Sequence, residues 1–352
     1  ALTSAVGRNV IVGYQAGITG TTGLNYSTFV GYQAGKLTTG DHNTFVGYGA
    51  GRDVTDGRNV AIGSLALRQA TTSTRNIAIG YGAISQAVTT GDDNLGIGYF
   101  ALQDLTSGTN NVAIGDALTS NTTANHNTAV GSGAMTANTT GTANVSFGSL
   151  SLDANTSGSY NTSIGYGTLT SNTTGHDNTA CGINSLAANT TAHYNTAFGA
   201  GALEGCTTGE YNVAVGNIAM DAANMTGNFN TAIGRSALGA NTSGSSNCAV
   251  GINALGGNTT GNTNCAMGDS ALDANTTGSN SVAIGVNALG AATTADQNTA
   301  CGNIALNKVT TGASNAAFGG NAGGACTTGN GNAFIGDSAG YGNTTGYSNT
   351  FV

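Results

Sequence analysis

The sequence predicts an all-β protein, a parallel β-solenoid of about twenty 17-residue coils. Three observations predict this fold. A short motif recurs every 16 to 18 residues, residues alternate within that motif as they do in a β-strand, and the 352 residues include 58 Gly and no Pro. Charged residues make up only 7%, which argues against ordinary disordered chains. The chain also has too few large side chains to fill the cores of conventional domains.

The recurring motif is Asn-x-Ala-(Ile/Val)-Gly, and its opening residue is Asn in nearly every copy, from Asn9 to Asn349. Counting that residue as position 1, a Gly occupies position 5 of every complete copy. The approximate consensus is N-(T/V)-A-(I/V)-G-x-x-A-L-x-x-N-T-T-G-x-x. This unit is shorter than the roughly 33 to 47 residues of helix-pair repeats. A fixed Gly and runs of Thr and Asn also disfavour a helix.

Each coil is expected to contain two short strands and two turns. The first strand runs from position 1 to position 5, with Ala at position 3 and an apolar residue such as Ile62 or Ile284 at position 4. A second strand is expected around the Ala-Leu pair, as at Ala66-Leu67. Gly-x-x and Asn-Thr-Thr-Gly supply the turns. We expect one row of Ile/Val and one row of Leu to fill the core.

Stacking such coils explains the composition. Each strand pairs in parallel with its copy in the next coil, about 4.8 Å away, so a charged column would place like charges together. Asn can form ladders along the stack, Gly supplies positive φ at corners, and Pro would remove a ladder hydrogen bond. About twenty coils predict a rod on the order of 100 Å.

The thin core predicts that several chains share it, and we expect a parallel homotrimer of identical chains. Residues 1–352 are expected to form one continuous tandem-repeat shaft. The opening ALTSAVGRN and the closing YSNTFV both suggest an excerpt of a longer protein.

The segments Asn161-Thr-Ser-Ile-Gly165 and Asn230-Thr-Ala-Ile-Gly234, each followed by Ala-Leu or a similar pair, resemble the head repeats of YadA-type trimeric adhesins. The longer unit with Asn275-Thr-Thr-Gly278 is more similar to the repeat regions of bacteriophage tail fibres, as is Asn43-Thr-Phe-Val-Gly-Tyr-Gly-Ala-Gly51. The resemblance covers essentially the whole chain. It implies a trimeric β-roll on a virion or on a bacterial cell surface.

Two sets of residues are candidate modification sites. Cys248 and Cys265 occupy the same column of adjacent coils, so their spacing suits a disulfide, although Cys as a small apolar filler is the favoured interpretation of all six cysteines. Nine Asn residues begin Asn-Thr-(Thr/Ser) sequons on turns expected to be exposed, where they are glycosylation candidates or simple turn residues. The sequons begin at Asn121, Asn138, Asn155, Asn172, Asn189, Asn241, Asn258, Asn275 and Asn343.

No constellation of residues predicts catalysis, a metal site or a cofactor. His42, His126, His176 and His193 all lie in the variable turn before the motif and are expected to be unrelated surface residues. Eight Lys and Arg, taken as spread along the chain, form no basic patch for nucleic acid, and no apolar run is long enough to span a membrane.

The leading hypothesis is a non-enzymatic structural protein, the stiff extracellular shaft of a phage tail fibre or bacterial surface fibre, which projects a receptor-binding tip. The alternative is an adhesin-like module that contacts cell-surface glycans or a receptor through its repeated turns. For this alternative, the Tyr residues that follow Gly at Tyr14, Tyr32 and Tyr48 are glycan-contact candidates, although a packing ladder is favoured. A minor alternative is an ice-binding solenoid with a Thr ridge.

Overall fold

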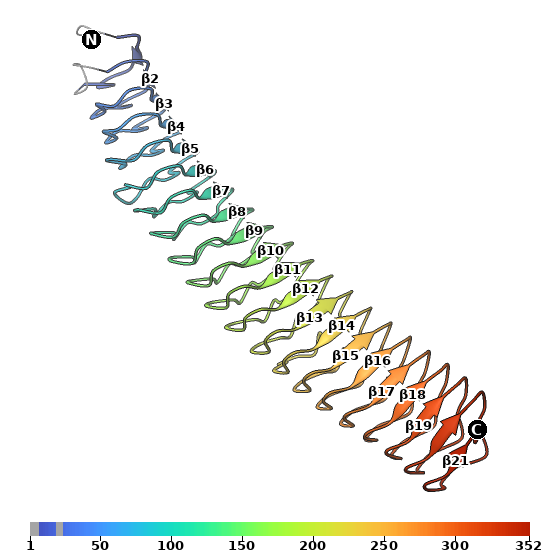
Figure 1. The fold of residues 1–352 in the computed structure, drawn as a ribbon. Coiled ribbons are helices and arrows are strands. Elements are labelled where there is room, and N and C mark those ends of the chain that lie inside the picture. The colour runs from blue at the N-terminus through green and yellow to red at the C-terminus, as the bar shows by residue number, and fades with distance from the viewer. Residues whose placement is uncertain (1–6, 19–23) are drawn as a thin grey trace. The chain divides into compact units, whose positions relative to one another are not determined.

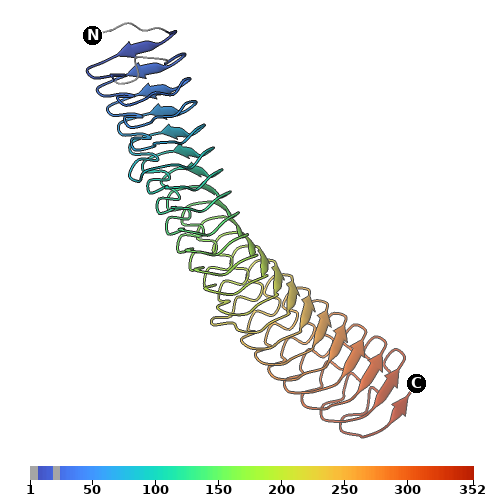
Figure 2. The ribbon, with the colours of Figure 1, turned by 60° about the vertical axis from the view of Figure 1, so that its left-hand side comes forward.

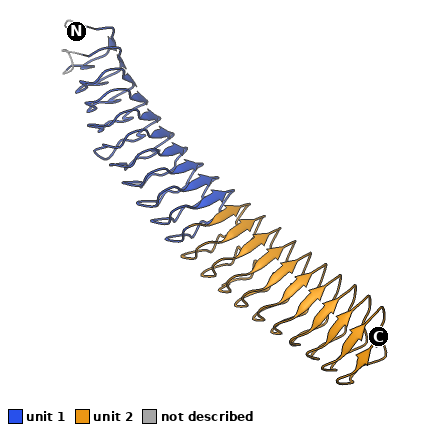
Figure 3. Cartoon of the chain, in the orientation of Figure 1, with its two compact units in different colours: residues 1–176 blue, residues 177–352 orange. Residues whose placement is uncertain are grey.

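The computed structural model describes residues 7–18 and 24–352, and its contacts divide the chain into two units, Ala1–His176 and Asp177–Val352. Each unit is a stack of coils of about 17 residues (Figure 3). The predicted all-β parallel solenoid is confirmed within both units, and no helix occurs in the described residues.

Every coil carries one strand, formed by positions 2 to 4 of the motif. The strands of the first unit are β1 (Val10–Val12), β2 (Thr28–Val30), β3 (Thr44–Val46), β4 (Val60–Ile62), β5 (Ile77–Ile79), β6 (Leu95–Ile97), β7 (Val112–Ile114), β8 (Thr128–Val130), β9 (Val145–Phe147) and β10 (Thr162–Ile164). Those of the second unit are β11 (Thr179–Cys181), β12 (Thr196–Phe198), β13 (Val213–Val215), β14 (Thr231–Ile233), β15 (Cys248–Val250), β16 (Cys265–Met267), β17 (Val282–Ile284), β18 (Thr299–Cys301), β19 (Ala316–Phe318), β20 (Ala333–Ile335) and β21 (Thr350–Phe351).

Neighbouring strands within each unit pair in parallel and in register. Between β12 and β13, for example, Ala197 lies opposite Ala214 and Phe198 opposite Val215. The strands of neighbouring coils therefore run side by side and point the same way (Figure 1, Figure 2). The register follows from the sequence, because each motif position lies opposite the same position of the motif in the next coil.

The predicted second strand is wrong. Residues around the Ala-Leu pair form turns, and the Leu itself adopts a left-handed backbone, with φ of 49° at Leu67 and 54° at Leu203. Main-chain bonds still join the coils there, since the Leu203 N–H donates to the Ala219 carbonyl at 2.9 Å. Tertiary hydrogen bonds thus hold a non-Gly residue in a conformation that costs it roughly 1 kcal/mol or more.

The interior of most coils holds Ala or another small residue at position 3 and Leu at position 9, so the expected place of the Ile/Val row is wrong. Ala197 at position 3 and Leu203 at position 9 are fully buried, whereas Phe198 at position 4 keeps 46% of its surface exposed. Side chains alternate along a strand, so positions 2 and 4 face outward when position 3 faces inward. Leu enters the narrow interior from the opposite wall, which leaves room for little more than a methyl group on the strand.

The invariant Gly at position 5 has a steric cause. At Gly199 φ is 134°, and a Cβ added there would lie 2.4 Å from the carbonyl oxygen of Gly216 in the next coil. Any side chain would force the coils apart as well as strain the backbone. The same close approach recurs in neighbouring coils, which explains why the sequence allows no substitution at this corner.

The opening Asn ties three coils together, as the predicted ladder requires. Asn212 donates from its backbone N–H to Asn195 Oδ1 at 3.0 Å, and its own Oδ1 accepts from the Asn230 N–H at 2.9 Å. Its Nδ2 donates to the carbonyl of Gly227 at 2.9 Å. Asn212 is fully buried, so its amide needs hydrogen-bond partners inside the protein, and these three bonds supply them.

Candidate functional surfaces

The outer face of the strands is a largely apolar surface in each unit. Positions 2 and 4 hold only Val, Ile, Leu, Phe, Met, Cys, Ala and Thr in every coil, without one charged or amide side chain. Large members remain about half exposed, among them Phe147 at 44%, Phe318 at 48% and Ile335 at 49%. We name this surface the outer strand face. A contiguous apolar surface of this kind is typical of a protein–protein interface.

The six cysteines are free thiols in two different environments. Cys181, Cys248, Cys265 and Cys301 are half-buried on the outer strand face, whereas Cys206 is buried inside its coil. Cys206 takes the place of a turn Asn and donates its thiol to the Gly209 carbonyl at 3.4 Å. Burial raises its pKa to about 12.

The expected stacking of Cys248 and Cys265 is confirmed, because they are register partners in β15 and β16. Partial burial raises the pKa of Cys265, and the neighbouring Cys248 thiol adds to that shift. Both thiols are free in the structure, and the disulfide between them stays a prediction.

The sequon asparagines are not exposed, contrary to expectation. Eight of them are fully buried and point into the coil, namely Asn121, Asn138, Asn155, Asn172, Asn189, Asn241, Asn258 and Asn275. Asn275 Nδ2 donates to Asn258 Oδ1 at 2.8 Å and to the Gly278 carbonyl at 3.0 Å, and Asn155 makes the matching bonds in the first unit. Asn343 alone among the nine is partly exposed. A glycosylating enzyme would have to open a coil to reach the other eight.

The Tyr residues after the corner Gly form a stack of rings. Ring centroids of Tyr14 and Tyr32 lie 5.5 Å apart and those of Tyr32 and Tyr48 5.2 Å apart, with the planes within 16° of parallel. The rings nevertheless remain accessible to solvent, with Tyr14 68%, Tyr32 42% and Tyr48 56% exposed. A second stack, which the sequence did not suggest, joins Tyr211 to Tyr194 at 4.8 Å and to Phe229 at 5.1 Å.

Thr hydroxyl groups of the Thr ridge donate hydrogen bonds to carbonyl groups of neighbouring coils. Thr259 Oγ1 donates to the Thr276 carbonyl at 2.9 Å, and Thr276 Oγ1 donates in turn to the Thr293 carbonyl at 3.0 Å. These donors are used within the protein, while the Thr that follows each of them is exposed. Of the histidines, His42 stacks on Tyr26 at 5.0 Å.

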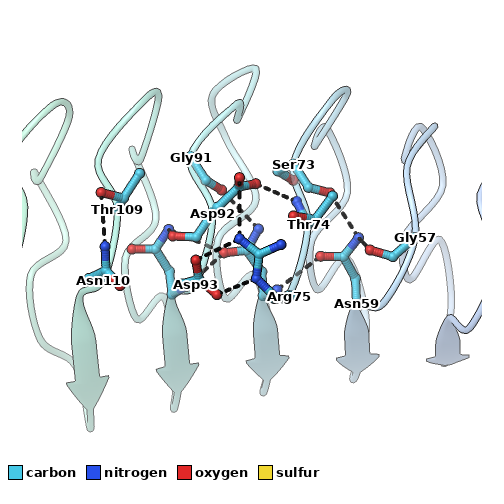
Figure 4. A network of polar contacts seen from close by, with 12 residues as sticks. Gly57, Asn59, Ser73, Thr74, Arg75, Gly91, Asp92, Asp93, Thr109 and Asn110 are labelled. Atoms are coloured by element: carbon cyan, nitrogen blue, oxygen red, sulfur yellow. Dashed lines mark hydrogen bonds and ion pairs between the residues drawn. The ribbon is translucent and has the colours of Figure 1, made fainter.

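Positive charge is concentrated near the start of the chain rather than spread along it. Six of the eight Lys and Arg residues lie within residues 1–76, a stretch with only three acidic residues. One of these cations, Arg75, holds Asp93 with two hydrogen bonds of 2.6 and 2.7 Å and lies 3.6 Å from Asp92 (Figure 4). The bonds from Arg75 lower the pKa of the Asp93 carboxyl. Asp92 also accepts the Thr74 N–H, so the cluster links adjacent coils.

A shallow groove of about 260 Å³ crosses the coils that begin at Asn59, Asn76 and Asn94. Its walls include Leu65, Arg68, Gln69, Tyr81, Gln86 and Phe100. The sequence gives one hint of it: position 7 is Gly82 in the middle coil, between the large Leu65 and Phe100 of the adjoining coils. Arg68 is half-buried, and its Nε is buried without a hydrogen-bond partner.

Two carboxylates on the turns are partly buried beside other acids. Burial raises the pKa of Asp221, and Glu204 in the preceding coil raises it further. Burial and Asp269 act in the same direction on the pKa of Asp273. Within residues 7–18 and 24–352, His, Cys, Asp and Glu form no group of three or more suited to a metal ion.

No helix in the described part of the chain has the length and apolar character needed to cross a bilayer. Comparison with known proteins finds no family model that matches the chain, and no curated protein matches it significantly.

Proposed function

We propose that the chain is a non-enzymatic structural protein, the stiff extracellular shaft of a phage tail fibre or bacterial surface fibre that projects a receptor-binding tip. In this proposal three identical chains associate in parallel through their outer strand faces. The resemblance of the repeats to tail-fibre and adhesin repeats supports the extracellular placement. The outer strand face is the observation that carries the proposal.

Identical chains are the partner that suits this face best. An occupant must present apolar side chains at the spacing of stacked strands, about 4.8 Å, over many coils. A parallel copy of the same chain presents that spacing and equally lacks charge, so it would leave no buried charge unpaired. Association would then remove from water residues such as Phe198 and Ile233, which are 46% and 42% exposed in the single chain.

The coil itself suits a mechanical role. Within the described part of each unit, neighbouring coils are joined by strand pairing, by the opening Asn and by turn hydrogen bonds. Each element is repeated rather than unique, as expected when length and stiffness matter more than a single reactive centre. The alternative binding role through the aromatic stripe is less favoured, because the stack of Tyr14, Tyr32 and Tyr48 occupies three coils, whereas the outer strand face recurs in every coil.

Thiol accessibility tests the association directly. Cys181, Cys248, Cys265 and Cys301 lie on the outer strand face, whereas Cys206 lies inside a coil. In the proposed trimer all of these thiols should be protected from a maleimide reagent. Mild dissociation should release the first four before Cys206. Rapid labelling of those four in the native protein, with light scattering that gives 34.3 kDa rather than three times that mass, would refute the trimer.

A pair of variants separates association from folding. Ile233→Asp places a charge on the outer strand face and should yield a folded monomer. Thr260→Asp adds the same charge on an exposed turn and should leave the trimer intact. Equal effects of the two changes would argue against the outer strand face as the interface.

A further inference from the structure

The groove beside Arg68 contains a cation without an acidic partner. In the preceding coil Arg52 is followed by Asp53, and the two form hydrogen bonds through Arg52 Nε at 2.8 Å and through Nη2 at 2.5 Å. Arg68 occupies the same position one coil later, but the residue after it is Gln69. No carboxylate lies within 4 Å of Arg68 in the described residues. A half-buried guanidinium with an unpaired Nε is thus left at the groove.

Tyr81 and Phe100 also line the groove, and both rings pack against Tyr99. The Phe100 ring lies 5.4 Å from Tyr81 in an edge-to-face arrangement and 4.2 Å from Tyr99. Tyr81 and Tyr99 are stacked at 5.6 Å. Three mutually packed rings need little ordering when a ligand binds, which favours recognition.

The Phe100 ring packs directly against Gly82 of the middle coil. A Cβ on Gly82 would lie 2.5 Å from the Phe100 ring, so no other residue fits there without displacing that ring. Gln69 and Gln86 add amide groups that can both donate and accept hydrogen bonds. The lining therefore combines one unpaired cation, neutral amides and an aromatic wall in a volume suited to a single small ring.

We propose that this groove binds a carboxylate-bearing sugar residue, such as a uronic acid unit of an acidic polysaccharide. The Arg68 guanidinium would pair with the carboxylate, because Arg forms charge-assisted and often bidentate hydrogen bonds with that group. The amides of Gln69 and Gln86 would contact hydroxyl groups. Tyr81 and Phe100 would contact the C–H groups of the sugar through their electron-rich faces. The site is independent of the shaft role and would add lateral attachment to it.

Calorimetric titration of the full chain with glucuronate, glucose and acetate tests the proposal. Glucuronate should bind at least tenfold more tightly than either glucose, which lacks the carboxylate, or acetate, which lacks the ring. Equal binding of glucose would show that Arg68 does not select the ligand. Equal binding of acetate would show that the aromatic wall contributes nothing. Either outcome, or no detectable glucuronate binding, overturns the proposal.

Three variants locate the binding. Gln69→Asp recreates the pair seen at Arg52 and Asp53, so it should weaken glucuronate binding about tenfold or more while Arg68 is retained. Arg68→Gln should have a similar effect. Arg58→Gln removes the same charge from an exposed position outside the groove and should change binding less than twofold. Unchanged binding in Arg68→Gln, or an equal loss in Arg58→Gln, would contradict the site. Light scattering on the same samples reports trimer assembly separately.

Discussion

Phe45 occupies the space that a side chain on Gly51 would need: a Cβ on Gly51 would lie 2.5 Å from Cδ2 and from Cε2 of the Phe45 ring. These two residues stand at positions 3 and 9 of their coil. In the next coil the same positions hold Ala61 and Leu67, with nearly the same backbone, since φ is 58° at Gly51 and 49° at Leu67. A large residue at position 3 with Gly at position 9, and a small residue at position 3 with Leu at position 9, thus fill the same interior volume in two ways.

Replacing Phe45 and Gly51 together by the Ala and Leu of the next coil should restore the stability that either replacement alone removes. Phe45→Ala leaves a cavity and should lower the free energy of unfolding by about 3–5 kcal/mol. Gly51→Leu overpacks the coil and should cost about 1–3 kcal/mol or more. The double variant should recover most of both losses, measured as coupling in a double-mutant cycle of thermal unfolding. Additive losses would show that the two positions do not share one volume.

Replacing a corner Gly should be far more harmful than replacing a Gly that has open space around it. Gly199→Ala places a Cβ 2.4 Å from the Gly216 oxygen at a φ of 134°, and the cost should be on the order of 3 kcal/mol. Gly342→Ala is the matched control, because nothing lies within 4 Å of its added Cβ. Thermal unfolding followed by circular dichroism should show a large downward shift for the first variant and almost none for the second. Similar shifts would refute the steric account.

Sequon burial predicts selective glycosylation. When the folded protein is treated with an oligosaccharyltransferase, Asn343 should be modified, whereas Asn155, which is fully buried and bonded to Asn138, should not. Unfolded chain should be modified at both. Mass spectrometry of peptides identifies the sites, and modification of Asn155 in folded protein would show that the coil opens readily.

The carboxyl of Asp221 should make stability depend on pH. Its pKa is raised in the folded protein, so the folded chain binds the proton more tightly than the unfolded chain does. Stability should therefore fall as the pH rises from the ordinary Asp pKa through the raised value, and the loss persists at higher pH. Asp221→Asn should remove this part of the pH dependence and raise the melting temperature near pH 7. Asp337→Asn, at an exposed position, is the control.

The sequence predicted the period, the parallel register and the strand position, because these follow from spacing and alternation alone. Alternation did not determine which side of the strand faces inward. Ile and Val were placed inside by hydrophobicity, yet Leu203 and its counterparts already fill the interior from the opposite wall, so only a small residue such as Ala or Ser fits beside them. The buried sequons were missed because Asn-Thr-Thr-Gly is typical of an exposed turn, while here the Asn275 side chain points inward and its Nδ2 donates two hydrogen bonds inside the stack.

The second strand was predicted because Ala-Leu is apolar, whereas the observed left-handed Leu is a conformation that local sequence disfavours. The groove at Arg68 was missed for another reason. It depends on residues from three coils, Leu65, Tyr81 and Phe100 among them, and on one place where the repeat departs from itself. A consensus taken over all copies of the repeat does not show a departure that occurs in one copy.

The left-handed Leu also bears on how the protein folds. An isolated coil would carry the cost of Leu203 in that conformation without the Ala219 carbonyl that compensates it. Nucleation of the first few coils is therefore expected to be slow, and each later coil should add rapidly onto the template that the previous one presents. Growth of the structure then resembles propagation along a line, with cooperativity set by contacts between neighbours.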